Sequence, residues 1–224
     1  MSAPPAGRGP VLLVVADDLG YDPAIDRGIL EAHRRGVVTA ASAMVDTPFA
    51  AEALASAPAT LAVGLHLVLP SGADPAEAAR ELSRQAQRFE ALRGRPPAHL
   101  DGHRHAHAAV LAGLLPWAGA KGLRVRALDG AMRDRIRAAR ALAADVFLGD
   151  AAARPCWTAD RLVEAIGGLV PGATELMCHP GYPPAVVRTS FGMEREQELD
   201  ALCDPRVAAA LRARRVRLAG TLPR

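Results

Sequence analysis

The chain of 224 residues has the length and composition of one soluble globular domain. Half of its residues are hydrophobic and 23% are charged, and no apolar run approaches the ~20 residues that span a bilayer. The net charge of +3 is spread along the chain, and aromatic residues make up only 4%. Composition therefore argues against a membrane-spanning protein and against a nucleic-acid-binding surface built from a basic block and stacking rings.

The cysteines and the first ten residues indicate in which cellular compartment the protein works. Cys156, Cys178 and Cys203 lie far apart and are odd in number, so they fit neither a disulfide framework nor a zinc ribbon. Residues 1–10 are rich in Pro and Gly and lack the basic start and apolar stretch of a secretion signal. We expect a single domain over 1–224 with a flexible N-terminus at 1–10, working in the reducing cytoplasm.

Strand-like and helix-like segments alternate along the chain, beginning with a buried strand at 11–16 and a helix at 23–35. Further strands are expected at 37–45, 61–69, 99–102, 123–128, 145–148, 175–178 and 216–219. Further helices are expected at 75–93, 108–121, 158–169 and 193–214, the last broken at Pro205. Repeated βα alternation predicts an α/β fold with a parallel sheet and outer helices. Seven or eight strands in this length favour a closed or nearly closed (βα) barrel.

Two carboxylates follow the first strand directly. The apolar run 11–16 ends in Asp17 and Asp18, which repel each other close to the core. One aspartate could cap the next helix, but two are harder to explain in that way. In parallel α/β folds the carboxyl ends of the strands carry the chemistry, so the pair predicts a functional site.

Histidines mark three further strand ends. His66 interrupts an apolar strand, and His179 closes the run before Pro180. His103 follows the strand at 99–102 and begins a cluster with two further histidines at alternating positions, His105 and His107. The alternation predicts that all three rings lie on one side of an extended segment.

These strand ends would converge at one mouth of a parallel barrel. One carboxylate and two neutral imidazoles, with positions left open for water, form a typical catalytic site for a divalent metal ion. Such an ion lowers the pKa of bound water and polarises a carbonyl group. A second aspartate could then serve as a base, and a histidine opposite could protonate a leaving group.

At this point the motifs resemble a known family, the YdjC/ChbG-like carbohydrate deacetylases, which are related to NodB-type polysaccharide deacetylases. The resemblance rests on motifs in family order from residue 11 to about 203, namely 16–20, 36–39, 64–67, 99–107, 177–182 and 195–199. It implies a distorted (βα) barrel that removes acetyl from an N-acetylated amino sugar or short oligosaccharide with one divalent metal ion. Relatives also suggest a homodimer.

The resemblance assigns roles to particular positions. It implies Asp18, His66 and His103 as metal ligands, with Asp17 as the general base and His179 as the general acid.

Other polar residues near these motifs receive supporting roles. Asp101 would orient a histidine or another catalytic group, and His105 and His107 would contact substrate or support the ligands. Arg126 would neutralise or orient a carboxylate.

Two departures from the family pattern bear on specificity. Relatives often carry a histidine where this chain has Arg104, so that position receives no metal role. The stretch between Leu69 and Ala76 is also short where relatives carry a longer insertion. Loops at a barrel mouth shape substrate choice, so a chitooligosaccharide, a glycolipid and an antibiotic intermediate all stay open as substrates.

Alternatives also remain for the activity and the metal. The activity could be that of another barrel metallohydrolase acting on a different amide or ester, although such enzymes usually carry a His-x-His pair after the first strand. A non-catalytic sugar-binding protein would have no need of a base at Asp17. Two histidines and one aspartate suit zinc, the resemblance points to magnesium, and manganese or cobalt could also serve.

Overall fold

The computed structural model describes residues 9–149, 156–189 and 191–222, so most of the N-terminus predicted to be flexible lies outside the described residues. A curled, all-parallel sheet runs in the order β5-β4-β3-β2-β1-β7-β6, and β8 pairs with β1. The strands are β1 Pro10–Leu19, β2 Ala40–Ala43, β3 Ala62–Leu67, β4 His99–Gly102, β5 Arg124–Val125, β6 Val146–Leu148, β7 Gly172–Cys178 and β8 Arg217–Leu218. The predicted α/β distorted barrel of seven to eight parallel strands is confirmed.

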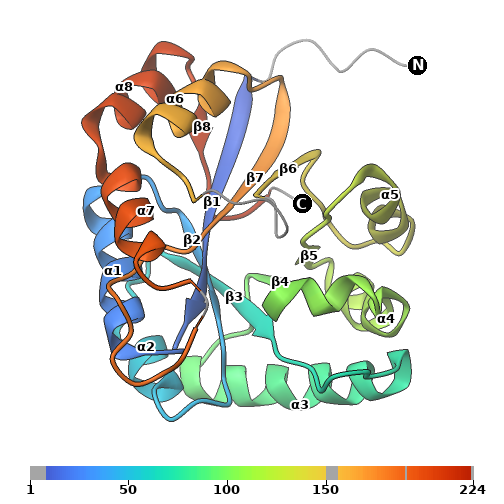
Figure 1. Ribbon diagram of the computed structural model, residues 1–224. Coiled ribbons are helices and arrows are strands. Elements are labelled where there is room, and N and C mark those ends of the chain that lie inside the picture. Colours follow the sequence, from blue (N-terminus) through green and yellow to red (C-terminus); the bar gives the residue numbers. More distant parts are fainter. Residues whose placement is uncertain (1–8, 150–155, 190, 223–224) are drawn as a thin grey trace.

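Helices lie around the outside of this curled sheet, as Figure 1 shows from α8 past α1 and α3 to α5. They are α1 Pro23–Arg35, α2 Ala50–Ser56, α3 Pro75–Arg93, α4 Leu111–Lys121, α5 Gly130–Ala138, α6 Ala159–Gly167, α7 Glu194–Cys203 and α8 Pro205–Ala213. A 3₁₀ segment, His103–Ala108, follows β4. The main hydrophobic core lies between the apolar faces of these α-helices and the outer face of the sheet.

Capping residues set several helix ends. Asp22 accepts a hydrogen bond from the Ala24 amide before α1, and Thr158 accepts one from the Arg161 amide before α6. Helix α3 ends at Gly94, whose φ of +72° is the left-handed conformation that favours glycine at this position.

The sequence-based assignment missed two short helices, α2 and α5. Helix α2 has only seven residues and lacks a side-chain N-cap, so its local pattern is weak. Helix α5, by contrast, has a local N-cap, because the Asp129 side chain accepts a hydrogen bond from the Met132 amide. The strand expected at 123–128 contracts to two residues of β5, because backbone pairing to β4 ends there.

Strand β1 is the centre of the sheet. It pairs with β7 from Pro10 to Ala16 on one side, and on the other side with β8 and then β2. The strand is buried on both faces from Val11 to Leu19, which explains its uninterrupted apolar run. Its carboxyl end therefore places Asp17 and Asp18 inside the protein.

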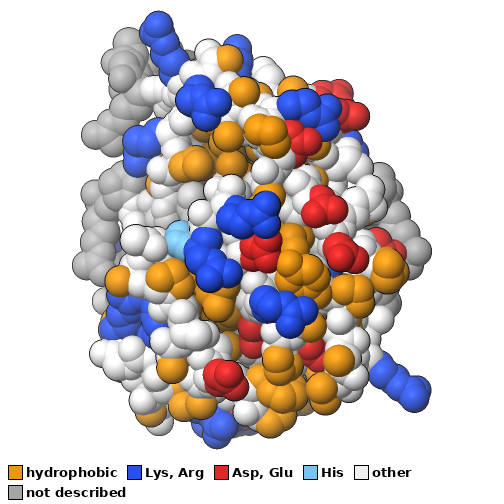
Figure 2. Space-filling view, turned by 90° about the vertical axis from the view of Figure 1, so that its left-hand side faces the viewer, with side chains coloured by type: hydrophobic (Ala, Val, Ile, Leu, Met, Phe, Trp, Pro, Cys, Tyr) orange, Lys and Arg blue, Asp and Glu red, His pale blue; other side chains and the backbone are white. Residues whose placement is uncertain are grey.

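The surface carries charges of both signs. On the helix-covered face in Figure 2, Arg and Lys side chains are interspersed with Asp and Glu. The positive net charge is therefore not gathered into a basic patch on this face. Among the described residues, no helix is long and apolar enough to cross a membrane.

Candidate active site

A bulge at the end of β1 brings both aspartates into one pocket. The register with β2 runs from Ala16 opposite Ala41 to Leu19 opposite Ala43, so β1 holds one extra residue there. Asp18 has a φ of +74°, a left-handed conformation that Asp tolerates better than most residues. Side chains of a regular strand alternate between faces, whereas this bulge lets Asp17 and Asp18 line the same cavity.

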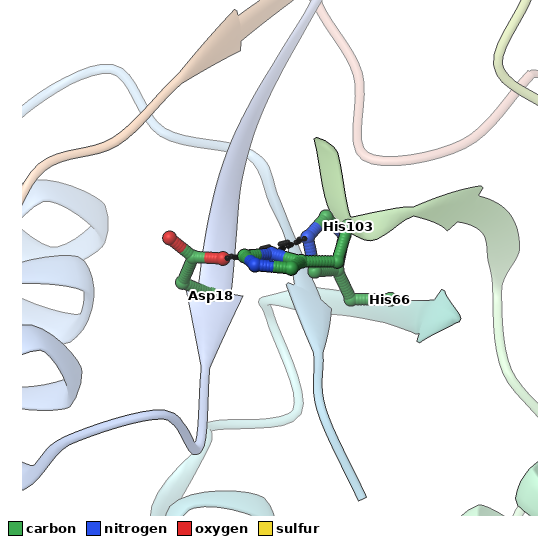
Figure 3. Close-up of side chains that lie close together, drawn as sticks. All are labelled: Asp18, His66 and His103. Atoms are coloured by element: carbon green, nitrogen blue, oxygen red, sulfur yellow. Dashed lines mark hydrogen bonds and ion pairs between the residues drawn. The ribbon is translucent and has the colours of Figure 1, made fainter. Parts of the chain in front are cut away.

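The three predicted ligands lie close together at this point. Asp18 Oδ1 lies 3.4 Å from His66 Nε2 and 3.3 Å from His103 Nδ1, and the two histidine nitrogens are 3.3 Å apart. Figure 3 shows the three side chains converging from separate segments of the chain. Asp18 and His66 are buried, and His103 is half-buried at the pocket.

The three atoms fit a cation. Ligands about 2.1 Å from a tetrahedral ion lie about 3.4 Å apart, which matches this triangle. Asp18 Oδ1 is buried and accepts no hydrogen bond of ordinary geometry, so it is an orphaned acceptor aimed between two imidazoles. Asp18, His66 and His103 therefore form a candidate metal-binding triad.

The Asp101 carboxylate contacts the side of the His66 ring that faces away from Asp18 and His103. Asp101 Oδ1 lies 2.7 Å from His66 Nδ1, which leaves Nε2 facing the triad. The other oxygen, Oδ2, accepts from Ser42 Oγ at 2.5 Å and lies 3.0 Å from Arg126 Nη2. The Asp101 side chain is fully buried, and although burial opposes its charge, Arg126 and His66 hold its pKa well below the usual range.

The surrounding charges also act on the triad itself. Burial opposes a charge on His66, but the carboxylates of Asp17 and Asp101 raise the pKa of this imidazole to about 10. Burial likewise opposes a charge on Asp18, but the nearby His103 and His66 and the Arg195 guanidinium hold its pKa well below the usual range. Without a metal ion, a protonated His66 adds to the charges of Arg126 and Arg195 in balancing these carboxylates.

Asp17 is held by a buried arginine. Arg126 Nη1 and Nη2 each donate to a different Asp17 oxygen at 2.7 Å, and Arg126 Nε donates to Glu175 Oε1 at 2.7 Å. Arg124 pairs with the same Glu175. The structure thus places Arg126, predicted to neutralise or orient a carboxylate, against Asp17, Asp101 and Glu175.

His179 lies at the end of β7 in the same cavity as both aspartates. Its ring centroid is 5.2 Å from that of Phe191, and its backbone amide donates to Glu198 Oε2 at 2.6 Å. Among the described residues, the His179 ring forms no hydrogen bond or ion pair with Asp18, His66 or His103, although all four line one cavity.

The histidine cluster after β4 differs from the expectation. The segment His103–Ala108 is not extended, because Arg104 and His105 adopt left-handed backbone conformations with φ of +51° and +57°. His105 lines the pocket, whereas His107 is buried, with Nε2 3.2 Å from the Arg126 carbonyl oxygen. The prediction that the three rings share one side of a strand is therefore wrong.

Burial lowers the pKa of both His105 and His107, and it lowers that of His107 to about 4. His107 is thus neutral at physiological pH, and its Nε2 contacts the backbone carbonyl of Arg126.

The cavity has a volume of about 390 Å³. Besides the acidic and histidine residues, it is lined by Tyr21, Gly102, Arg104, Met177, Thr189, Phe191 and Arg195. Arg195 received no role from the sequence, although it lies in a motif of the resemblance, and no local pattern indicates that α7 reaches the end of β1. The aromatic walls at Tyr21 and Phe191 were also not predicted.

Comparison with known proteins identifies the family of the chain. The model of the YdjC-like protein family matches residues 11–213. The chain belongs to the YdjC-like family.

Curated relatives of this YdjC-like chain cover nearly all of it. A carbohydrate deacetylase of Geobacillus stearothermophilus is 33% identical over 92% of this chain and 94% of its own length. A chitooligosaccharide deacetylase of Salmonella paratyphi B is 30% identical over 91% and 95%. A crystal structure of an Enterococcus faecalis protein named as a cellobiose-phosphate cleavage protein superposes with a TM-score of 0.81 at 25% identity, over 95% of this chain and 97% of that one.

Proposed function

We propose that this protein is a metal-dependent hydrolase that removes the acetyl group from an N-acetylated amino sugar. The single observation that carries the proposal is the triad of Asp18, His66 and His103 beside Asp17, a second carboxylate held by Arg126. The names of the relatives, carbohydrate deacetylase and chitooligosaccharide deacetylase, support the substrate class.

The triad would hold one divalent cation. Bound there, the ion would polarise the acetyl carbonyl and make a water molecule more acidic. Two imidazole nitrogens and one carboxylate oxygen suit zinc, cobalt or manganese better than magnesium, which prefers oxygen ligands and octahedral geometry. We therefore propose a transition metal as the functional ion.

Asp17 would act as the general base. Its carboxylate lines the cavity beside the triad, and the two hydrogen bonds from Arg126 fix its plane. It would take a proton from the water whose oxygen attacks the carbonyl carbon of the acetamide. Because Asp18 Oδ2 is held by Arg195 rather than by Arg126, the two neighbouring aspartates have separate supports.

His179 would complete the reaction as the general acid. It lines the cavity with Asp17 and Asp18, and its ring packs against Phe191. Proton donation to the amide nitrogen would allow the C–N bond to break, releasing acetate and the free amine of the sugar. Asp101, His105 and His107 would support the ligands or the substrate from the positions described above.

We also propose that the protein works in a reducing compartment such as the cytoplasm. Cys156, Cys178 and Cys203 are all free thiols.

An acetate-release assay tests the function. The purified protein, stripped with a chelator and reloaded with zinc, cobalt, manganese or magnesium, is incubated with N-acetylglucosamine oligomers, N-acetylated glycolipids and N-acetylated aminoglycoside intermediates. Phosphate esters and a phosphorylated disaccharide serve as control substrates. Metal-dependent acetate release from at least one N-acetylated compound supports the proposal, and cleavage confined to the control substrates contradicts it.

A further inference from the structure

Helix α7 places the buried guanidinium of Arg195 at the end of β1. Arg195 Nη2 donates to Asp18 Oδ2 at 2.6 Å, although the two residues are 177 positions apart. Both side chains are buried, and Arg195 is among the largest fully buried side chains of the described chain. A charge-assisted hydrogen bond of this length in a buried place is strong and directional.

The two oxygens of Asp18 consequently face different partners. Oδ2 is occupied by Arg195, whereas Oδ1 lies 3.3 to 3.4 Å from the two histidine nitrogens and accepts no ordinary hydrogen bond. Figure 3 shows one Asp18 oxygen directed at the histidines and the other directed away from them. A cation at the triad would therefore meet a single free oxygen of this carboxylate.

Arg195 is itself fixed in place. Its Nε donates to the Phe191 carbonyl oxygen at 2.9 Å, and its own carbonyl oxygen accepts from the Gly181 amide at 3.1 Å. The guanidinium carbon also lies 5.8 Å from the Phe191 ring centroid. The Nε hydrogen bond and the ring of Phe191 hold the guanidinium beside Asp18 Oδ2, and the Gly181 contact fixes the Arg195 backbone.

We propose that Arg195 is a positioning residue that holds one oxygen of Asp18 and makes this aspartate a one-oxygen metal ligand. The inference rests on the metal site of the proposed function and deepens it by assigning a determinant of metal selectivity. Calcium takes six to eight oxygen ligands and often binds both oxygens of a carboxylate. Occupation of Oδ2 by Arg195 thus disfavours calcium relative to ions that accept few, mixed nitrogen and oxygen ligands.

The test compares the affinities of the full-length protein for Co²⁺ and Ca²⁺, measured by calorimetry, together with the visible absorption spectrum of the cobalt form. Arg195→Gln removes the charged donor, and Arg195→Lys keeps a cation that can donate to Oδ2. Arg206→Gln is the matched control, because Arg206 forms exposed ion pairs with Asp160 and Asp204 on the helix side of the molecule. Removing the Arg195 charge affects the affinities for both divalent ions in the same direction, so the ratio of the two affinities cancels this general effect.

In Arg195→Gln the Ca²⁺-to-Co²⁺ affinity ratio is expected to rise roughly tenfold, within the range seen for partners of metal ligands, and the cobalt spectrum to change. Arg195→Lys and Arg206→Gln are expected to keep the wild-type ratio. A wild-type ratio and spectrum in a folded Arg195→Gln protein would overturn the inference.

A crystal structure of the cobalt-loaded wild-type protein tests the same point without a variant, should Arg195→Gln fail to fold. Cobalt on Asp18 Oδ1 alone, with Arg195 still on Oδ2, supports the inference, and cobalt on both oxygens contradicts it. If the wild-type protein binds no Co²⁺, the metal site of the proposed function fails and this inference fails with it. If it binds Co²⁺ and the ratio does not respond to Arg195, the inference fails alone.

Discussion

Arg126 and Asp17 form a two-pronged ion pair inside the barrel. Both guanidinium Nη atoms lie 2.7 Å from a different Asp17 oxygen, and both side chains are buried. The pair links the end of β5 to the end of β1. Because both carboxylate oxygens are bonded, the Asp17 carboxylate is held in one orientation. The proposed base is therefore positioned by a group that does not touch the metal-binding triad's own carboxylate.

Arg126→Lys tests that positioning. Lysine keeps the positive charge but cannot make two parallel hydrogen bonds to one carboxylate. The loss of a charge-assisted contact corresponds to about tenfold to a hundredfold in kcat, measured at saturating metal because Arg126 also contacts Asp101, the partner of His66. Steady-state kinetics and metal analysis check this, with thermal melting as the control for folding. An unchanged kcat would show that the second hydrogen bond is not needed.

Metal binding is expected to be pH-dependent through His66. Because neighbouring carboxylates raise the pKa of this imidazole to about 10, a proton occupies it at neutral pH and must leave before a cation binds. Affinity should therefore tighten by about tenfold per pH unit from pH 7 to 9, with about one proton released per ion. Calorimetry in buffers of different ionisation enthalpy measures both quantities. A pH-independent affinity would contradict the prediction.

Asp101→Asn tests the support of His66. The substitution removes the charge that lies 2.7 Å from His66 Nδ1, and partners of this kind alter metal affinity by roughly 10- to 100-fold. We expect a loss in that range. Ser42→Ala is the matched control, because it removes a neutral donor to the same carboxylate while the charge stays. Equal losses in the two variants would mean that the charge of Asp101 does not matter.

Much of this site follows from local sequence, because apolar runs with polar ends identify the strands and their carboxyl ends. That logic places Asp17, Asp18, His66 and His103 together without knowledge of any distance. The bulge in β1 and the left-handed turn at Arg104 could not be predicted, since they depend on register with other strands and on packing. The contact of Arg195 with Asp18 could not be predicted for the same reason, because only the packing of α7 brings the two residues together.

Asp26 is expected to make stability pH-dependent. Burial raises its pKa to about 7, and the charges of Asp22 and Glu52 add to this, although the Gly20 amide hydrogen bond opposes it. A raised pKa in the folded state means that the stabilisation is complete below the unfolded value near 3.8 and is lost as pH rises through 7.

Asp26→Asn isolates this effect, because asparagine is neutral and keeps an oxygen acceptor for the Gly20 amide. Each unit of pKa shift corresponds to about 1.4 kcal/mol. Urea unfolding at pH 5 and pH 8 should show that the wild-type protein loses more free energy of unfolding with rising pH than the variant does. Equal changes in both proteins would contradict the assignment.

The division of labour between Asp17 and Asp18 is the central claim, and one paired measurement of bound metal and acetate release tests it most directly. Asp17→Asn should keep the wild-type metal content and lose acetate release by about 100-fold or more, the usual contribution of a general base. Asp18→Asn should lose the metal itself, because it removes the carboxylate of the triad. Full acetate release by Asp17→Asn, or wild-type metal content in Asp18→Asn, would contradict the account.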